Sequence, residues 1–497
     1  MRLSELLEEL GMDARALKDL DITGLTADSR AVRPGYLFAA LPGSKMDGRS
    51  YIGDAVKRGA CAVLAPPGTE LGNAMYVEGA DAKGNHVRLI TVSNPRRRFA
   101  LMAARFFAAQ PDIVAAVTGT NGKTSTAHFT QQLWTHLGYK AGYLGTLGAS
   151  APSIRIEGSL TTPDPVVLHG LLAEMAKQGV THAAIEASSH GLHQFRVDGI
   201  KIAIAGFTTF TRDHLDYHGS MAAYLAAKLR LFSDVMIAGG IAVLNADTPE
   251  FHAFESTCRM RGHRVISYGK QGETLRLTGI TVEGDAQVLD LLALDKDYRV
   301  RLPLAGSFQV GNALCALGFV LAAGADPDRA IAALECLTGV PGRMQRVGFH
   351  ASGAPVYVDY AHTPDALETA LLALKPHAAR NLVVVFGCGG DRDRGKRRMM
   401  GEIAQRLAND VYVTDDNPRT EEASQIRAEV MQGSPNARNI GNRSEAIALA
   451  VNGLKPGDVL LLAGKGHETG QIVGTTVIHF SDVEEAQRAL GLGGATS

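Results

Sequence analysis

Residues 112–125, DIVAAVTGTNGKTS, join a short apolar run to a glycine-rich loop. The run Ile113–Val117 is continuous and partly β-branched, which is typical of a strand buried on both faces of a parallel sheet. The loop at 118–125 is followed by a helical pattern that continues through Trp134 and Leu137. A strand that turns through glycines into a helix predicts a phosphate-binding loop at the edge of an α/β sheet.

The loop TGTNGKTS is a shortened form of the phosphate-loop pattern. The full pattern has a glycine at position 117, where this chain has Val117, so the motif reads GxxGKT. Glycines let the backbone point N–H groups inward, Lys123 can reach terminal phosphate oxygens, and the Thr124 hydroxyl can ligate Mg²⁺. A tight turn with an incidental lysine is the alternative interpretation. The residues predicted to bind the nucleotide here are Gly119, Thr120, Asn121, Gly122, Lys123, Thr124 and Ser125.

Further apolar runs without polar alternation extend the pattern along the chain, separated by helical stretches such as 165–179. The runs occupy 182–187, 202–210, 240–245, 356–360, 381–387, 410–415 and 458–464. Such alternation predicts right-handed βαβ units, and the chain length favours about three domains. We predict an α/β protein with domains at 1–100, 101–338 and 339–497. The Gly- and Pro-containing segment at 337–347 is the expected hinge before the last domain.

Composition points to an ordinary globular chain that handles small molecules. Of the 497 residues, 45% are apolar and 20% are charged, and the formal net charge of -1 gives no case for nucleic acid or a membrane as partner. The five cysteines are scattered and form no CxxC pair, which fits a reducing compartment. The N-terminus lacks a signal-peptide pattern and no apolar run is long enough to span a bilayer. We therefore expect a cytoplasmic protein.

Candidate metal ligands follow two neighbouring predicted strands. Glu186 opens EASSHGLHQFR at 186–196, and His214 lies in TRDHLDYHG at 211–219. The carboxyl ends of parallel strands meet at one edge, so both side chains are expected to face the phosphate loop. Mg²⁺ prefers oxygen donors, which favours Glu186 over any histidine. For the other histidines of these segments, hydrogen-bonded loop residues are the favoured interpretation.

Two cations remain ambiguous from their residue types alone. Lys228, in YLAAKLRLF, has the position of a lysine on an amphipathic helix that extends its ammonium to water. Arg419 is the one cation in DDNPRTEE at 415–422. It is either part of a solvated turn, where ion pairs are worth about 0–1 kcal/mol, or a group that recognises a small carboxylate.

Eight motifs together resemble a known family, the ATP-dependent Mur ligases of peptidoglycan synthesis. They occur in the family's order across nearly the whole chain: TGTNGKTS, EASSHGL, TRDHLDYHG, AKLRLF, PGRMQRV, VDYAHTPDAL, FGCGGDRDRGKR and DNPR. The resemblance implies an N-terminal domain for a UDP-sugar, a central ATPase domain and a mobile C-terminal Rossmann-like domain that brings an amino acid. One departure is Gln309 in GSFQVGN, where the family often has asparagine.

The resemblance also implies roles for individual residues. Lys228 would carry a CO2-derived carbamate that supports Mg²⁺ together with Thr124, Glu186 and His214, and these residues with Lys123 would form the catalytic group. Further ATP contacts would come from Asn312, Arg343, Asp359 and His362. The UDP-muramoyl dipeptide would be held by Ser29, Thr161, Thr162, Ser188, Gln194 and Arg196.

The motif DNPR resembles the members of the family that add meso-2,6-diaminopimelate to UDP-N-acetylmuramoyl-L-alanyl-D-glutamate. The arginine fork matches the distal carboxylate of diaminopimelate, and Asp416 and Asn417 are expected to accept from its ammonium. The complete predicted pocket is Arg392, Asp416, Asn417, Pro418, Arg419, Gly464 and Glu468. The expected reaction passes through an acyl phosphate formed from ATP, in an enzyme expected to be a monomer.

Four alternative functions share part of these motifs. The same ligation with L-lysine is the nearest alternative. A phosphate-loop kinase would release a phosphorylated product without using an amino acid, and a nucleotide-binding module without catalysis would have no use for DDNPRTEE. Folate-polyglutamate ligases share the fold and the loop, but DNPR points away from them.

Overall fold

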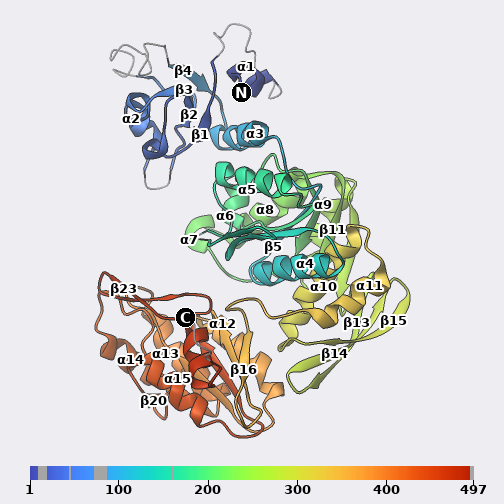
Figure 1. The fold of residues 1–497 in the computed structure, drawn as a ribbon, viewed down its shortest axis with the longest axis vertical. Coiled ribbons are helices and arrows are strands. Elements are labelled where there is room, and N and C mark those ends of the chain that lie inside the picture. The colour runs from blue at the N-terminus through green and yellow to red at the C-terminus, as the bar shows by residue number, and fades with distance from the viewer. Residues whose placement is uncertain (9–19, 44–45, 72–86, 159, 493–497) are drawn as a thin grey trace. The chain divides into compact units, whose positions relative to one another are not determined.

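The computed structural model describes residues 1–8, 20–43, 46–71, 87–158 and 160–492 (Figure 1). They divide into two compact units, one formed by Met1–Ile266 with Ala322–Gly324 and the other by Ser267–Leu321 with Ala325–Ser497. Each unit has its own parallel sheets and buried cores, so the predicted α/β class is confirmed. The boundaries at 100 and 338 remain predictions.

The first unit opens with a four-stranded parallel sheet in the order β1-β2-β3-β4. The strands are β1 (Gly24–Thr26), β2 (Tyr36–Ala39), β3 (Ala60–Ala65) and β4 (Arg88–Thr91). Helices α1 (Leu3–Glu8) and α3 (Pro95–Phe107) contribute to the buried cluster on one face, and α2 (Ile52–Lys57) contributes to the cluster on the other. All six residues of β3 are buried, as expected for a strand covered on both faces.

The larger sheet of the first unit runs in the order β11-β10-β5-β9-β6-β7-β8. Its parallel strands are β5 (Ile113–Thr118), β6 (Ala141–Gly145), β9 (His182–Glu186), β10 (Ile202–Phe207) and β11 (Met236–Asn245), and each of the first-unit runs predicted above overlaps one of them. Strands β7 (Gly148–Ala151) and β8 (Ile154–Ile156) add an antiparallel edge. Strand β5 has β9 on one side and β10 on the other, so the chain changes direction across the sheet at the phosphate loop.

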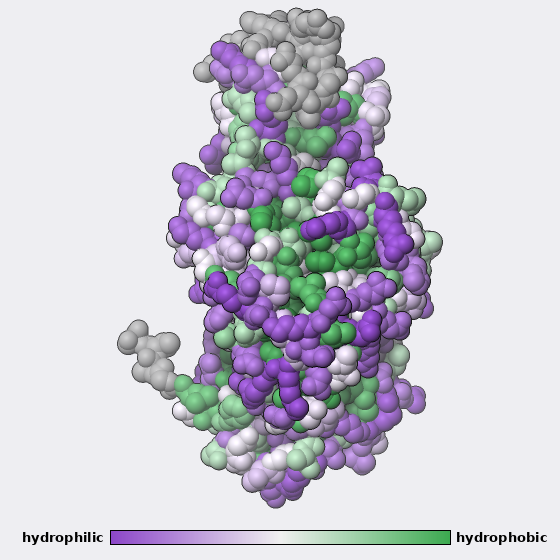
Figure 2. Space-filling model, turned by 90° about the vertical axis from the view of Figure 1, so that its right-hand side faces the viewer, coloured by the Kyte–Doolittle hydropathy of each residue, from purple (hydrophilic) through white to green (hydrophobic). Residues whose placement is uncertain are grey.

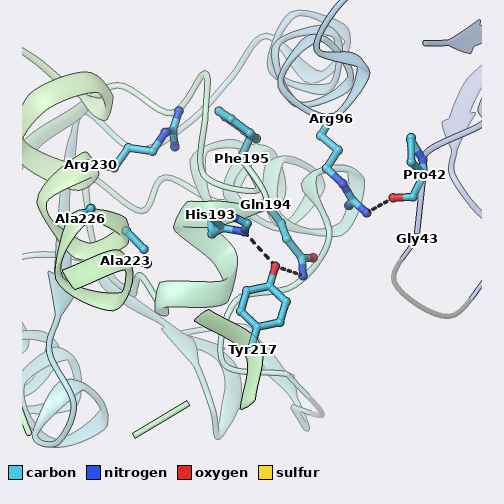
Figure 3. A pocket seen from close by; sticks show the side chains of 11 residues that line it. Pro42, Gly43, Arg96, His193, Gln194, Phe195, Tyr217, Ala223, Ala226 and Arg230 are labelled. Atoms are coloured by element: carbon cyan, nitrogen blue, oxygen red, sulfur yellow. Dashed lines mark hydrogen bonds between the residues drawn. The ribbon is translucent and has the colours of Figure 1, made fainter. Parts of the chain in front are cut away.

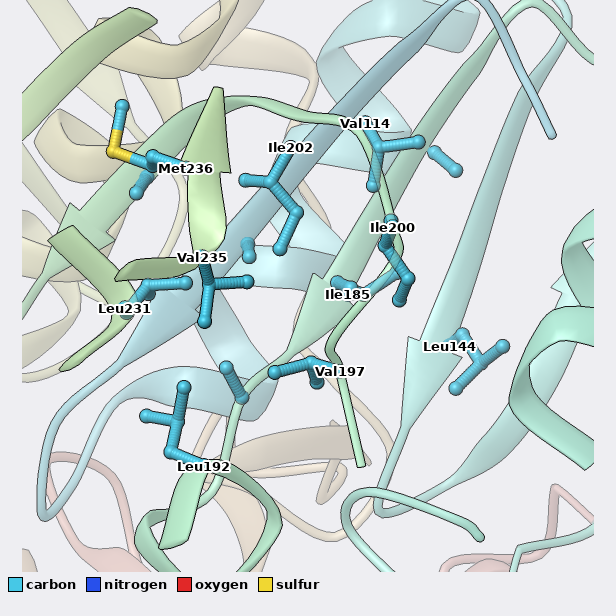
Figure 4. Close-up of a cluster of buried hydrophobic side chains, with 14 of the residues drawn as sticks. Val114, Leu144, Ile185, Leu192, Val197, Ile200, Ile202, Leu231, Val235 and Met236 are labelled. Atoms are coloured by element: carbon cyan, nitrogen blue, oxygen red, sulfur yellow. The ribbon is translucent and has the colours of Figure 1, made fainter. Parts of the chain in front are cut away.

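Helices cover both faces of this sheet. Helix α5 (Pro165–Lys177) contributes to one core, with α9 (Phe251–Met260) and the π-helical turn Leu231–Val235 (Figure 4). Helix α4 (Lys123–His136) buries Phe129 and Trp134 outside that cluster, and Figure 1 shows it below the sheet with α5 above it. Three short helices, α6 (Ser189–His193), α7 (Leu215–His218) and α8 (Met221–Arg230), follow the carboxyl ends of β9 and β10.

Helix α3 explains why the first predicted domain and part of the second fall into one unit. It packs against α5, and its Arg97 Nε lies 3.0 Å from a carboxylate oxygen of the buried Asp198. Arg230 donates to the same carboxylate from α8, at 2.6 and 2.8 Å. A sequence pattern does not reveal such contacts across a predicted boundary, because they depend on side chains that are distant in sequence.

The second unit begins with an antiparallel meander that the sequence interpretation missed. It consists of β13 (Leu275–Glu283), β14 (Ala286–Ala293) and β15 (Lys296–Leu302). Strand β12 (Arg264–Gly269) crosses the division between the units. The meander is followed by the apolar helix α10 (Ser307–Ala322) and by α11 (Pro327–Ala332).

A six-stranded sheet forms the rest of the second unit, in the order β16-β17-β21-β18-β19-β20. Strands β17 (Pro355–Asp359), β18 (Leu382–Phe386), β19 (Asp410–Val413), β20 (Arg438–Asn439) and β21 (Val459–Ala463) are parallel, and β16 (Gln345–Phe349) is antiparallel. Helices α12 (Pro364–Leu374), α13 (Gly395–Leu407) and α14 (Ala423–Met431) contribute to the core on one face, and α15 (Arg443–Asn452) and α16 (Asp482–Ala489) to the core on the other. The hairpin of β22 (Gly470–Val473) and β23 (Thr476–His479) stands beside this sheet.

The face of the molecule in Figure 2 mixes polar and apolar residues. Among the described residues, no helix combines the length and the apolar character that crossing a bilayer requires.

Candidate active site

The phosphate loop follows β5 and leads directly into α4. A Cβ added to Gly119 would lie 1.9 Å from Thr208 Oγ1, so a larger residue would collide with the segment after β10. Gly122 has a φ of +86°, a left-handed conformation that glycine adopts at little cost. Helix α4 begins right after it without a side-chain cap, and such a helix N-terminus is a suitable site for an anion. The loop therefore fits the phosphates of a nucleotide.

The segment after β10 holds this loop in place. Thr120 N donates to Thr209 O at 2.7 Å, and Thr208 Oγ1 donates to Asn121 O at 2.6 Å. The Thr120 hydroxyl lies 3.2 Å from the Tyr224 hydroxyl of α8. These contacts fix the shape of the loop.

Two lysines share one carbonyl oxygen of the phosphate loop. Lys123 Nζ donates to Gly119 O at 2.9 Å and to Thr120 O at 2.9 Å. Lys228 Nζ, on α8, donates to the same Gly119 O at 2.7 Å and lies 4.4 Å from the centre of the Tyr224 ring. Lys228 is buried, and this burial together with the nearby charge of Lys123 holds its pKa well below the usual range. The interpretation of Lys228 as a surface lysine is therefore wrong.

Glu186 is a buried carboxylate at the end of β9 that accepts four hydrogen bonds. Thr124 Oγ1 donates to it at 3.0 Å, so the structure brings two predicted site residues together. Tyr143 donates at 2.6 Å, and Thr146 donates through its backbone at 2.8 Å and its hydroxyl at 3.2 Å. These hydrogen bonds hold the Glu186 carboxylate in one orientation beside the start of α4.

His214 lies at the edge of this group in a left-handed conformation, with a φ of 51°. Its ring contacts His190 and Tyr224, with centroids 4.7 and 6.0 Å apart, and its Nε2 lies 3.4 Å from Asp213. The Tyr224 ring also contacts Lys228, so His214 and Lys228 both contact the same ring. No three His, Cys, Asp or Glu side chains within the described part of the chain could hold a metal ion among themselves.

Most of the residues predicted to hold the UDP-muramoyl dipeptide form one hydrogen-bonded group. Thr162 Oγ1 donates to Glu186 O at 2.9 Å and accepts from Ser188 N at 3.0 Å. Arg196 donates to Thr162 O at 2.7 Å and to Gln194 Oε1 at 2.7 and 3.2 Å. The Thr161 hydroxyl joins the group through Thr146, at 3.0 Å. Five of the six predicted residues thus lie together beside Glu186.

A cavity of about 690 Å³ adjoins this group (Figure 3). Gln194 lines it and donates to the Tyr217 hydroxyl at 3.0 Å, and His193 Nδ1 lies 2.9 Å from the same hydroxyl. Arg96 and Arg230 also line it, and Arg230 is paired with Asp198. Ser29 begins a short 3-10 helix after β1 and is not among the residues that line this cavity.

In the second unit, the predicted nucleotide residues Asn312 and Arg343 are linked by Gln309. Asn312 Nδ2 donates to Gln309 Oε1 at 3.0 Å, and Gln309 Nε2 donates to Arg343 O at 3.4 Å. The departure from the family's usual asparagine therefore supplies a partner for Asn312. The Arg343 guanidinium lies 4.8 Å from the Tyr360 ring centre.

Asp359 and His362 flank that tyrosine in sequence. Asp359 accepts from Met344 N at 2.6 Å and from Ala361 N at 2.9 Å. Burial raises its pKa, against the charge of Arg343 and these two N–H groups. Burial likewise lowers the pKa of His362, whose Nδ1 lies 2.8 Å from Tyr360 O.

The DNPR loop follows β19 and is held by the β22–β23 hairpin. Arg419 N donates to Ile472 O at 3.1 Å, and Arg419 O accepts from Gly474 N at 2.8 Å. Arg419 Nη1 donates to Gly390 O at 2.7 Å, which ties the loop to the segment after β18. A Cβ at Gly389 would lie 2.9 Å from Arg419 Nη1 and 3.9 Å from Arg392 Cγ, so both predicted arginines border this glycine.

The acceptor side of this pocket differs from the expectation for Asn417. Its Oδ1 already accepts from Lys465 Nζ at 3.1 Å and from Ile472 N at 2.9 Å, and its Nδ2 donates to Glu468 Oε2 at 3.1 Å. The oxygens left for an ammonium ion belong to Asp416 and Glu468. Gly464 has a φ of +118°, and a Cβ there would lie 3.7 Å from Asp416 Oδ2.

Left-handed backbone conformations occur at or next to several of the predicted site residues. The non-glycine residues Phe195, His214, Met344, Asp391 and Arg419 all have φ between 48° and 60°. Each is a predicted site residue or a sequence neighbour of one. Such conformations cost about 1–3 kcal/mol each and persist where the surroundings over-determine them, as at ligand sites.

Comparison with known proteins gives a consistent assignment over the whole chain. Residues 21–107 match the Mur ligase family catalytic domain, 117–320 the Mur ligase middle domain and 342–466 the Mur ligase glutamate ligase domain. The UDP-N-acetylmuramoyl-L-alanyl-D-glutamate–2,6-diaminopimelate ligase of Bradyrhizobium diazoefficiens is 49% identical over 99% of both chains. The chain belongs to the Mur ligase family. The ligase of the same name from Caulobacter vibrioides is 50% identical over 94% of this Mur ligase and 95% of its own length.

Solved structures agree with the fold of this Mur ligase. A 2,6-diaminopimelate ligase structure covers 99% of both chains with a TM-score of 0.73 and 33% identity. A folylpolyglutamate synthase of Mycobacterium tuberculosis covers 79% of this chain and 95% of its own, with a TM-score of 0.60 at 20% identity. The second likeness concerns the fold alone.

Several residues around these groups were missed by the sequence interpretation. Tyr143, Thr146 and Tyr217 orient predicted site residues of this Mur ligase. No sequence signal separates Tyr143 and Thr146 from ordinary core or loop residues, whereas Tyr217 lies in the motif TRDHLDYHG. Lys465, in AGKGHE, had a signal, because it is a lysine between two glycines directly after a strand.

Proposed function

We propose that the protein is an ATP-dependent ligase that joins meso-2,6-diaminopimelate to UDP-N-acetylmuramoyl-L-alanyl-D-glutamate. The observation that carries the proposal is the DNPR loop, which contains Arg419 and Asp416 and contacts Glu468 through Asn417. Diaminopimelate has a carboxylate and an ammonium at its distal end, and these are the groups that such a pair of charges recognises. The names of the relatives support the same amino acid, and nothing in the comparisons favours L-lysine.

The expected chemistry of the first unit is phosphoryl transfer from ATP. Lys123 and the N-terminus of α4 would offset charge on the phosphates, which is the main task in such a reaction. The dipeptide carboxylate would accept the γ-phosphoryl group to give an acyl phosphate. The incoming amine would then displace phosphate and form the amide bond. Thr162, Ser188, Gln194 and Arg196 are proposed to hold the dipeptide, and Ser29 the uridine part.

Mg²⁺ fits the oxygen-rich surroundings of Thr124 and Glu186. When bound there, it would neutralise charge on the phosphate oxygens. A carbamate on Lys228 would add an anion to this region, and His214 would lie at its edge. The lowered pKa of Lys228 supports this modification, because only a neutral amine can add CO2.

Four residues of the second unit are also proposed to bind ATP: Asn312, Arg343, Asp359 and His362. The pocket for diaminopimelate is proposed to consist of Arg392, Asp416, Asn417, Pro418, Arg419, Gly464 and Glu468. We also propose that the enzyme acts in the cytoplasm as a monomer, for which a single species of the chain's mass, 52.6 kDa, is expected in light scattering.

The function is tested by measuring ATP cleavage with each substrate omitted in turn. ADP formation is expected to require the UDP-muramoyl dipeptide. When diaminopimelate is also present, the enzyme is expected to form the tripeptide product. A phosphorylated product formed without any amino acid would indicate a kinase, and nucleotide binding without turnover would indicate a binding module. Efficient addition of lysine in an amino-acid panel would favour the alternative ligase.

Lys228→Ala is expected to be nearly inactive, because it removes the amine that would carry the carbamate. Added formate or acetate is expected to restore part of the activity by replacing the missing anion. The measurement is the ligation rate against carboxylate concentration. A matched variant, Lys201→Ala, removes an exposed lysine of the same unit and is expected to retain activity and show no rescue.

Mass measurement of the intact protein provides the independent check. Wild-type protein kept in bicarbonate is expected to show the added mass of one CO2, and Lys228→Ala is expected to lack it. Full activity of wild-type protein that carries no such modification would contradict the proposal.

A further inference from the structure

Lys465 is a fully buried lysine that the reaction described above does not use. It lies in the turn after β21, between Gly464 with a φ of +118° and Gly466 with a φ of +56°. A Cβ on Gly466 would lie 2.7 Å from Tyr360 Cβ, so the turn is closely packed. The two glycines allow the chain to fold over so that the lysine side chain is enclosed.

The ammonium of Lys465 lies among the acceptor side chains of the amino-acid pocket. It donates to Asn417 Oδ1 at 3.1 Å and to Gly470 O at 2.8 Å. It also lies 3.3 Å from Asp416 Oδ1 and 3.6 Å from Glu468 Oε2. Asn417 in turn donates to Glu468, which closes a network around one cation.

A second buried cation nearby shows what a structural ion pair looks like in this unit. Arg443 and Asp482 are both fully buried, and two hydrogen bonds of 2.7 Å join them. Arg443 also donates to Ala463 O at 2.9 Å. It joins α15 to α16 and β21. The charged partners of Lys465 are instead two carboxylates of the pocket itself.

We propose that Lys465 is a positioning residue that orients Asp416, Asn417 and Glu468 and thereby helps the pocket prefer diaminopimelate to lysine. The proposal rests on the proposed function. With Lys465 present, the two carboxylates and the ammonium carry one net negative charge. Together with the cation Arg419 of the same DNPR loop, this charge balance matches a distal group that has one ammonium and one carboxylate.

The same charge balance disfavours lysine, whose distal group is an ammonium alone. Without Lys465 the two carboxylates would be uncompensated, and the pocket would attract a bare cation more strongly. Asn417 and Glu468 would also lose the group that holds them together. Removal of Lys465 should therefore weaken diaminopimelate binding and reduce the discrimination against lysine at the same time.

The test compares Lys465→Gln with Lys465→Met in the complete enzyme. Neither side chain carries a charge. Glutamine can still donate hydrogen bonds, whereas methionine cannot. We expect KM for diaminopimelate to rise about tenfold or more, with the larger rise in Lys465→Met. The ratio of kcat/KM for diaminopimelate over lysine should fall by about tenfold or more, while KM for ATP and for the UDP-muramoyl dipeptide should stay within about twofold.

A matched control is Arg380→Met. Arg380 lies 3.4 Å from the buried carboxylate of Asp458 at the opposite, amino-terminal end of β21. Its loss removes the exposed cation that pairs with another buried carboxylate of the same unit. Thermal unfolding should shift in this variant, but the amino-acid ratio should not. A fall in the ratio in Arg380→Met as well would overturn a specific role for Lys465.

A double variant that preserves the net charge provides a second test. It can be used even if Lys465→Met alone fails to fold. Lys465→Met with Asp416→Asn removes one cation and one anion together, so the net charge of the network is unchanged. Its preference for diaminopimelate over lysine is expected to exceed that of Lys465→Gln. The inference is overturned if the double variant does not regain this preference. It is also overturned if Lys465→Gln keeps the wild-type KM and ratio. If wild-type enzyme adds no diaminopimelate at all, the proposed function itself fails.

Discussion

A Lys123→Ala variant is expected to lose ligation by about 10³-fold while it still folds. Its ammonium lies at the start of α4 beside the phosphate loop, where it can move onto the phosphoryl group that is transferred. The charge on those oxygens grows in the transition state, so the loss should fall mainly on kcat. The measurement is steady-state ligation at saturating ATP.

Folding and nucleotide binding need separate controls for this variant. Lys123 also donates to Gly119 O and Thr120 O, so some loosening of the loop is expected. Thermal unfolding and ATP affinity should distinguish this effect from lost catalysis. Lys201→Ala again serves as the neutral comparison. Turnover near the wild-type rate in Lys123→Ala would refute the phosphate-loop interpretation.

Arg419→Ala is expected to raise KM for diaminopimelate by about 10²–10³-fold, which corresponds to the loss of one partner of a buried charge pair. Addition of lysine should change little, because lysine has no carboxylate for the guanidinium to bind. The wild-type enzyme should prefer diaminopimelate to lysine by about 10⁴-fold or more, since a polar site rejects analogues that leave its groups unpaired. The measurement is kcat/KM for both amino acids in both enzymes.

Backbone strain at Arg419 calls for a second variant. Its φ of 52° is unfavourable for alanine but not for glycine, so Arg419→Gly removes the guanidinium without that cost. KM for diaminopimelate should rise to a similar extent in both variants. Arg398→Ala removes an exposed arginine of α13 from the same unit, and this variant should leave KM for diaminopimelate unchanged. Unchanged apparent affinity in Arg419→Ala and Arg419→Gly would contradict the assigned role.

The strands that carry the site could be predicted because they are buried on both faces. Continuous apolar runs such as Ile113–Val117 and 382–386 have no polar face, so their local pattern is enough to identify them. The meander β13–β15 was missed because its outer strands, β13 and β15, are partly exposed and the segment contains no motif. The phosphate loop and DNPR could be identified because their glycines and proline impose local geometry.

The surroundings of the site residues could not be predicted in the same way. Nothing in TRDHLDYHG or EASSHGLHQFR indicates that Tyr217 joins Gln194 to His193, because the two segments meet only after folding. Asn417 was expected to accept from the substrate, but its oxygen is already occupied by Lys465 and Ile472. The assignment of Lys228 to the site depended on the family resemblance, and its burial became visible only in the structure.

The sequence by itself therefore determined the fold class, the phosphate loop and the order of the family's motifs. These depend on local patterns of burial, backbone freedom and charge that neighbouring residues carry. Only the tertiary structure decided which side chains share an environment, such as Lys123 with Lys228 at Gly119 O, or Lys465 with Asp416 and Glu468. Charges and hydrogen bonds act over a few ångströms in space, and residues far apart in the chain come within that range only when the sheets assemble.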